Sequence, residues 1–150
     1  HILVEGFAIG LATIFFNIFM VVGRLVGDQA RDLLGTFQFI LLLIFFCICG
    51  LIIIFSFKSI FTSIIGFSLL GLGVSNIIPL AYSISSNIDN IDSAVSISII
   101  SIAAYGVFMF APALMGLIAN IFGISYVFLP MIILFSICLI VVFSSKKLLV

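Results

Sequence analysis

Charge is what this sequence lacks. Only 7% of its 150 residues are Asp, Glu, Lys or Arg, whereas 65% are hydrophobic, and the mean hydropathy is +1.61. A soluble domain carries about 25% charged residues, because the outside of a small domain has to be covered by polar side chains. The composition therefore excludes a soluble fold and predicts an integral membrane protein.

Residues that bind metals or nucleic acids are scarce as well. The net charge is zero, so nothing favours nucleic acid as a partner. His1 is the only histidine, and the Cys47-x-Cys49 pair has no third or fourth ligand nearby, so we interpret the cysteines as small buried hydrophobes. No His, Asp or Glu lies deep within an apolar run, which disfavours an intramembrane enzyme. The sequence thus indicates no catalytic residue, no metal and no cofactor.

Five apolar runs are long enough to cross a bilayer as helices, for which about 20 residues are needed. These spans cover about residues 6–22, 36–57, 59–84, 93–122 and 126–143. The runs are continuously apolar, whereas the strands of a membrane β-barrel alternate. We therefore predict an all-α membrane protein with five transmembrane helices in a single transmembrane domain. The first run follows His1 closely without the features of a signal peptide, so we expect a piece of a longer polypeptide.

The basic residues predict the orientation of the spans. Arg24 and Arg31 follow the first span, and Lys146 and Lys147 close the chain. Four spans separate the two sites, which places both on one face of the membrane, and the positive-inside rule assigns that face to the cytoplasm. We expect a multi-pass protein of the inner cell membrane with its carboxyl terminus in the cytoplasm.

Polar and small residues follow one face in three of the spans, in steps of three, four and seven. They are Gly6, Gly10, Thr13 and Asn17 in the first span, Ser68, Gly71, Ser75, Pro79 and Tyr82 in the third, with Asn76 beside this stripe, and Ser98, Ser101, Tyr105, Pro112 and Gly116 in the fourth. The second and fifth spans are apolar on all sides, which predicts that they face lipid or pack without a site. The stripes have two explanations that stay open, a water-lined cavity or close packing with hydrogen bonds between helices.

Two prolines lie inside the spans that carry these stripes. Pro79 and Pro112 each remove a backbone hydrogen bond, so we expect the third and fourth helices to bend there. Bent or broken helices surround the central site of many transporters.

Three segments, 23–35, 66–80 and 105–116, resemble consecutive parts of a major facilitator superfamily secondary transporter. The first is similar to the loop between the eighth and ninth helices, the second to the tenth helix and the third to the eleventh. The likeness is to the branch of fucose-permease-like and related bacterial sugar or drug-type carriers. It implies that the five spans are helices 8–12 of that fold, a truncated six-helix half-bundle. The amino-terminal half of the transporter and the seventh helix are then missing.

The resemblance implies transport of a small solute, sugar-like or another small organic molecule, by alternating access. Together with the stripes it predicts a substrate cavity lined by Asn17, Ser75, Asn76, Ser101 and Tyr105. The implied partners are the lipid bilayer, the solute and the missing amino-terminal half. Whether transport is coupled to a proton stays open, because no carboxylate lies within a span and coupling would use residues of the missing part.

The charged segment between the first two spans is predicted to be a conformational latch loop. Its members are Arg24, Asp28, Arg31, Asp32 and Gly35. A carboxylate at a helix end can cap a neighbouring helix, and an arginine can pair with it, so such contacts favour one conformation. The family places a basic residue after the second aspartate, where this chain has Leu33. The alternative is that both arginines only anchor the span by the positive-inside rule.

Another interpretation of the whole chain also stays open. A remnant of a transporter gene, or a structural or assembly protein with several spans, would insert into the membrane without transporting anything.

Overall fold

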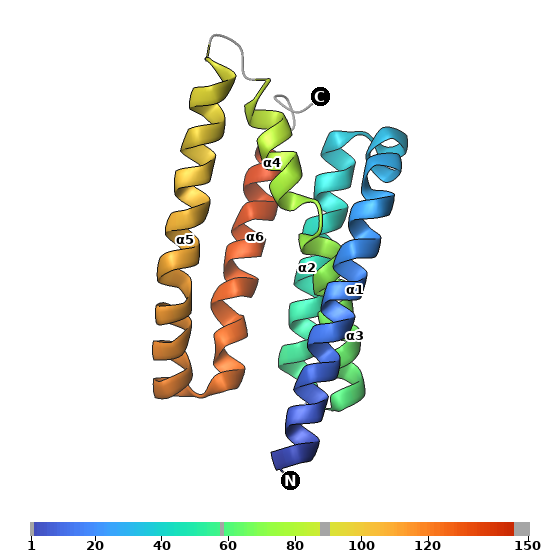
Figure 1. Ribbon diagram of the computed structural model, residues 1–150, viewed down its shortest axis with the longest axis vertical. Coiled ribbons are helices and arrows are strands. Elements are labelled where there is room, and N and C mark those ends of the chain that lie inside the picture. The colour runs from blue at the N-terminus through green and yellow to red at the C-terminus, as the bar shows by residue number, and fades with distance from the viewer. Residues whose placement is uncertain (1, 58, 88–90, 146–150) are drawn as a thin grey trace. The chain divides into compact units, whose positions relative to one another are not determined.

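The computed structural model describes residues 2–57, 59–87 and 91–145, with side chains in these ranges from residue 10 onward. All regular structure in these ranges is helical (Figure 1). The elements are α1 (Ile2–Leu34), α2 (Thr36–Ser56), α3 (Ile60–Val74), α4 (Ile77–Ser85), α5 (Ser93–Phe122), the 3₁₀ helix η1 (Ile124–Val127) and α6 (Phe128–Ser144).

Within the described ranges, five helical segments are long and apolar enough to cross a membrane, which confirms the prediction of an all-α membrane protein. They are Gly10–Leu34, Thr36–Ser56, Ile60–Ser85, Ser93–Phe122 and Ile124–Ser144. The last four follow the predicted spans within a few residues. The first is longer than predicted, because α1 continues without a break through the charged segment.

The prediction of a loop over residues 24–35 is therefore wrong. This stretch contains no proline and is rich in the good helix formers Arg, Leu, Gln and Ala, so the helix continues through it. Gly35 alone separates α1 from α2, and its φ of 79° is the left-handed conformation that glycine adopts without strain. The Gly35 N–H still donates to the carbonyl of Arg31 at 2.8 Å, which closes the last turn of α1.

The helices form two compact units, one of α1, α2, α3 and α6 and one of α4, α5 and η1. The chain crosses between them at two places, one after Val127 and the other after Asn76. At the same place the third span is interrupted, since α3 ends at Val74 and α4 begins at Ile77. The predicted bend site, Pro79, lies just beyond this interruption, whereas α5 continues as a helix through Pro112.

In the first unit, α3 packs against both α1 and α2, and α6 packs against α2. Glycines bring these backbones close together. A Cβ atom on Gly50 of α2 would lie 2.6 Å from the carbonyl oxygen of Gly66 on α3, and one on Gly73 would lie 2.7 Å from the carbonyl oxygen of Leu43. Small residues drive helix association in membranes in this way, because packing replaces the hydrophobic effect there. The rings of Phe67 and Phe128 add an edge-to-face contact between α3 and α6, with centroids 6.5 Å apart.

In the second unit, α4 and α5 are neighbours joined by a side-chain hydrogen bond. The hydroxyl groups of Tyr82 on α4 and Ser101 on α5 are 3.1 Å apart. Asp92 begins α5 by accepting a hydrogen bond from the Ala94 N–H at 2.9 Å, which satisfies one of the free donors at the helix start. Gly123, with a φ of 99°, ends α5.

Candidate functional site

The interruption of the third span packs directly against α1. A Cβ atom on Gly23 would lie 2.5 Å from Oγ of Ser75, and a Cβ atom on Gly27 would lie 2.6 Å from Cγ of Asn76. No side chain fits at such distances unless its neighbour moves. Because the two glycines are four residues apart, they lie on one face of α1. They form a notch that receives Ser75 and Asn76.

Hydrogen bonds fix this pair of residues to α1 and to the end of α3. The amide nitrogen of Asn76 donates to the Gly23 carbonyl at 2.7 Å and lies 3.0 Å from Oγ of Ser75. The Ser75 hydroxyl donates to the Leu72 carbonyl at 2.6 Å. From α1, Nε of Arg24 donates to the backbone carbonyl of Ser75 at 3.2 Å. Side chain and backbone groups of two spans thus form one polar network.

The network is buried. Ser75 has no exposed surface, and Asn76 is 7% exposed. Burying an unpaired polar group at such a position costs on the order of several kcal/mol, which is the free energy of transferring such a group from water to an apolar solvent. The hydrogen bonds above therefore explain how an amide and a hydroxyl can be accommodated between two membrane helices.

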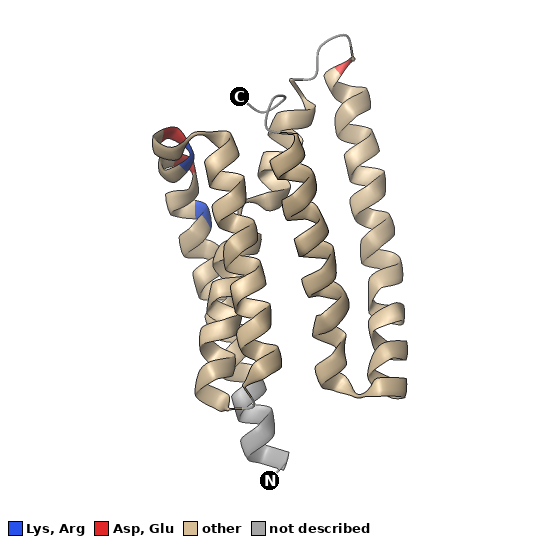
Figure 2. Ribbon diagram, turned by 180° about the vertical axis from the view of Figure 1, so that it is seen from behind, with Lys and Arg blue, Asp and Glu red and all other residues tan. Residues whose placement is uncertain are grey.

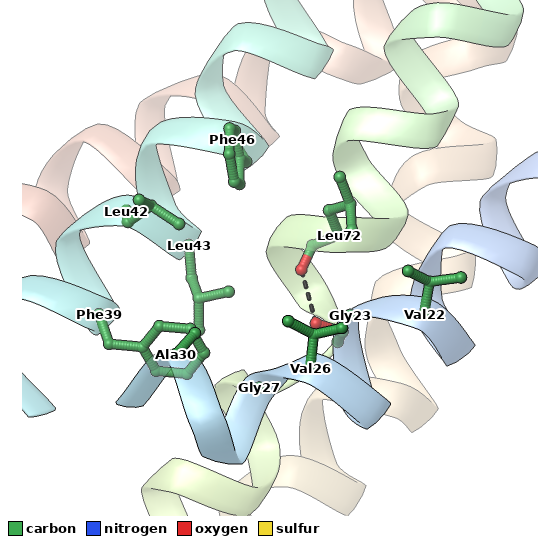
Figure 3. Close-up of a pocket in the computed structure, with 11 residues that line it drawn as sticks. Val22, Gly23, Val26, Gly27, Ala30, Phe39, Leu42, Leu43, Phe46 and Leu72 are labelled. Atoms are coloured by element: carbon green, nitrogen blue, oxygen red, sulfur yellow. Dashed lines mark hydrogen bonds between the residues drawn. The ribbon is translucent and has the colours of Figure 1, made fainter. Parts of the chain in front are cut away.

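A cavity lies beside this network, between α1, α2 and α3 of the first unit (Figure 3). Its volume is about 180 Å³. The lining is almost entirely apolar, and Figure 3 shows Val22 and Val26 of α1 and Phe39, Leu42 and Phe46 of α2 around it. Ser75 contributes the polar edge. Its hydroxyl is bonded to Leu72, so the cavity offers little hydrogen bonding to a polar solute.

Asn17, the remaining cavity candidate in the first unit, is in a different environment. Asn17 is exposed, and its amide nitrogen donates to the Thr13 carbonyl one turn earlier in α1, at 2.8 Å. This bond lies within one helix, so Asn17 can exchange it for water or a solute without disturbing the contact between helices.

Ser101 and Tyr105, the candidates of the second unit, lie one turn apart on α5. The Ser101 hydroxyl donates to the Ile97 carbonyl at 2.8 Å and is also in contact with the Tyr82 hydroxyl. Tyr105 is 73% exposed. The structure therefore places Ser75 and Asn76 in one network and Ser101 and Tyr105 on one stretch of α5.

The predicted latch residues form the charged end of α1. Figure 2 shows acidic and basic residues gathered on these last turns. Asp28 and Asp32 are exposed, and Nε of Arg31 donates to the Thr36 hydroxyl at 3.4 Å across the turn into α2. Lys146 and Lys147, on which the orientation also rests, lie outside the described residues.

Sequence reasoning missed three features, two of them on α1 and one on α5. Gly23 was interpreted as the edge of a loop, and Gly27 as part of it, although two glycines four residues apart are a known contact signal between membrane helices. The bond of Arg24 to a backbone carbonyl has no sequence signal, because it depends on how α1 and α3 pack. Ser96, on α5, is 5% exposed, and its hydroxyl has no hydrogen-bond partner among the described residues.

Comparison with known proteins points to membrane transport. The chain is 27% identical over 115 residues to the membrane protein MosC of Rhizobium meliloti, which covers 77% of this chain and 28% of that protein. It is 31% identical over 119 residues to an uncharacterized MFS-type transporter of Yersinia pestis, covering 79% of this chain and 31% of that protein. No family model matches, and no solved structure matches. The chain thus spans about a third of the length of these relatives, and the likeness to the second supports membership of the major facilitator superfamily.

Proposed function

We propose that this chain is part of a major facilitator secondary transporter that moves a small solute across the inner cell membrane by alternating access. The similarity to an MFS-type transporter over 79% of the chain carries this proposal. Five helices that can cross a membrane support it. In this proposal the helices are numbers 8–12 of the fold, the branch is fucose-permease-like, and the carboxyl terminus is cytoplasmic.

The solute is a neutral hydrogen-bonding molecule, such as a sugar, and it contacts Asn17, Ser101 and Tyr105. The Asn17 amide bonds within its own helix and Tyr105 is exposed, so each can turn to a solute, whereas Ser101 would exchange its 3.1 Å contact with the Tyr82 hydroxyl for one with the solute. Ser75 and Asn76 do not contact the solute directly, because their polar atoms already bond within the protein and their surfaces are buried. They hold in place the helices that line the solute cavity.

The charged end of α1 is the latch of this proposal, as a helix end rather than a loop. Asp28 and Asp32 project from the last turns of α1 and are exposed, so their carboxylates can cap a helix of the amino-terminal half. Such a contact favours the conformation in which the two halves meet at this face.

Cysteine accessibility in the full-length protein tests the solute-contact proposal. After replacement of Cys47, Cys49 and Cys138, single cysteines at positions 17 and 105 are compared with cysteines at 45 and 134. Phe45 and Leu134 are 58% and 62% exposed, so steric access resembles that of Tyr105. A membrane-impermeant thiol reagent should modify 17 and 105 much faster, and solute should protect them.

Equal modification at all four positions would contradict the proposed water-lined cavity. Slow modification everywhere, together with normal insertion and no uptake, would instead favour the alternative of a structural protein or a transporter remnant.

A further inference from the structure

We infer that Arg24 is a positioning residue that replaces a backbone donor missing from the third span. Its Nε–H satisfies the Ser75 carbonyl, which the sequence of the following turn leaves without its helical partner. This role differs from anchoring the span by charge. It concerns the junction between α3 and α4, and it does not require that the protein transports anything.

Proline chemistry creates the need for the donor. In an uninterrupted helix the N–H of residue 79 would donate to the carbonyl of residue 75, four positions earlier. Residue 79 is proline, which has no N–H. The third span is interrupted at this point, with α3 ending at Val74 and α4 beginning at Ile77. The Ser75 carbonyl therefore needs another donor.

Burial makes the missing bond costly. Ser75 has no exposed surface, so water cannot reach its carbonyl as it would at the end of a surface helix. Nε of Arg24 lies 3.2 Å from this oxygen, within the range of N–H···O hydrogen bonds. A donor that carries charge forms a stronger bond to a carbonyl than a neutral one.

The notch in α1 aligns the two groups. Asn76, the next residue, donates to the Gly23 carbonyl at 2.7 Å, and the absence of a side chain on Gly23 lets Ser75 approach. Arg24 follows Gly23 directly, so the same approach that seats Ser75 brings its carbonyl within reach of the Arg24 side chain. The role of Arg24 thus depends on the two junction residues and on Pro79 together.

Two substitutions of Arg24 separate hydrogen bonding from charge. In Arg24→Gln the amide nitrogen is attached to Cδ, at the same number of bonds from Cα as Nε of arginine, so it can donate to the Ser75 carbonyl without charge. In Arg24→Met the side chain has similar length and no donor. A positioning role predicts that glutamine largely retains stability and methionine does not, whereas anchoring by charge predicts that both lose it equally.

Pro79→Ala completes a double-mutant cycle, because alanine restores the N–H that can bond to Ser75. We would heat the full-length protein in detergent and measure, by size-exclusion chromatography, the temperature at which half of the monodisperse peak is lost. Arg24→Met should lower the midpoint when Pro79 is present and lower it by less than half as much in the Pro79→Ala background. If the Arg24→Met protein is recovered only in combination with Pro79→Ala, that rescue supports the inference equally.

Arg31→Met is the matched control, since it removes the same charge from the same end of α1 without touching Ser75. Its effect should be the same in both backgrounds. Equal shifts for Arg24→Met in both backgrounds, or failure to recover it in either, would overturn the inference. So would equal losses for Arg24→Gln and Arg24→Met. None of these readouts uses transport, so a failure of the proposed function would leave the outcome intact.

Discussion

The third and fourth spans are similar in composition but use their polar residues differently. In the third span Asn76 bonds to α1, and Gly71 lies where a Cβ atom would collide with the carbonyl oxygen of Phe16 on α1. In α5, the fourth span, Ser98 donates to the Ala94 carbonyl one turn earlier in its own helix at 2.6 Å, whereas Ser101, which donates to the Ile97 carbonyl at 2.8 Å, also contacts the Tyr82 hydroxyl of α4.

The difference separates two uses of polar residues in a membrane helix. A group that bonds across helices fixes a contact and is unavailable for a ligand, because releasing it leaves a buried partner unpaired. A group that bonds back to its own helix can exchange partners at small cost. A polar stripe alone therefore does not identify a solute site, since the third span carries such a stripe and uses much of it for packing.

The largest difference in stability is expected when one methyl group is added to the third span and one to the fourth. In Gly71→Ala the new Cβ would lie 3.1 Å from the Phe16 carbonyl carbon and 3.2 Å from the Met20 nitrogen, and these backbone atoms cannot turn away. We expect destabilisation of about 1–3 kcal/mol, as for overpacked cores. Chemical denaturation in mixed micelles would measure it.

Gly116→Ala on α5 is the matched control, because open space surrounds that position within the described residues. Its stability should stay within about 0.5 kcal/mol of the parent or rise, since alanine favours a helix more than glycine does. If both variants lose the same stability, the contrast between the spans would be wrong.

The next largest difference in stability is expected between substitutions of two asparagines. Asn76→Ala removes the donor to the Gly23 carbonyl and should cost about 1–2 kcal/mol, whereas Asn17→Ala loses only a bond within α1 and should cost less than about 0.5 kcal/mol. Membrane insertion should be normal for both. Uptake by the full-length protein should fall for both, and unchanged uptake in Asn76→Ala would remove this residue from the transport machinery.

The smallest effect concerns the hydroxyl pair of the second unit. Ser101→Ala and Tyr82→Phe each break the same 3.1 Å contact, so each should cost about 0.5–1 kcal/mol and the double variant little more than either one. Tyr105→Phe, at a position 73% exposed, should leave stability unchanged and act only on solute affinity. Full additivity of the Ser101 and Tyr82 variants would show that the contact contributes nothing.

The fold class and four of the five spans could be predicted from the sequence, because long apolar runs determine where a chain crosses a membrane. The end of α1 could not be predicted in the same way. Charged residues between apolar runs are typical of loops, yet residues 24–34 also favour helix, and packing of Gly23 and Gly27 on α3 supports that choice. The position of the charges predicted a loop, whereas helix propensity and tertiary packing both favour the helix that the structure shows.

The candidate site was predictable in its members but not in its bonding. Helical spacing placed Ser75 and Asn76 on or beside one polar face, where the structure has them in one network. Whether a polar residue faces a cavity or a neighbouring helix depends on which helix lies opposite. One sequence does not contain that information, so Asn17, Ser101 and Tyr105 remain predictions as solute contacts.

The single residue between α1 and α2 constrains how this part of the chain can be built. Gly35 reverses the chain direction alone, with a φ that other residues adopt only under strain. An added or deleted residue would rotate one helix by about 100° relative to the other, given 3.6 residues per turn. The connection therefore fixes the rotation of α2 relative to α1, and length variation among homologous proteins should be absent here while longer connections tolerate it.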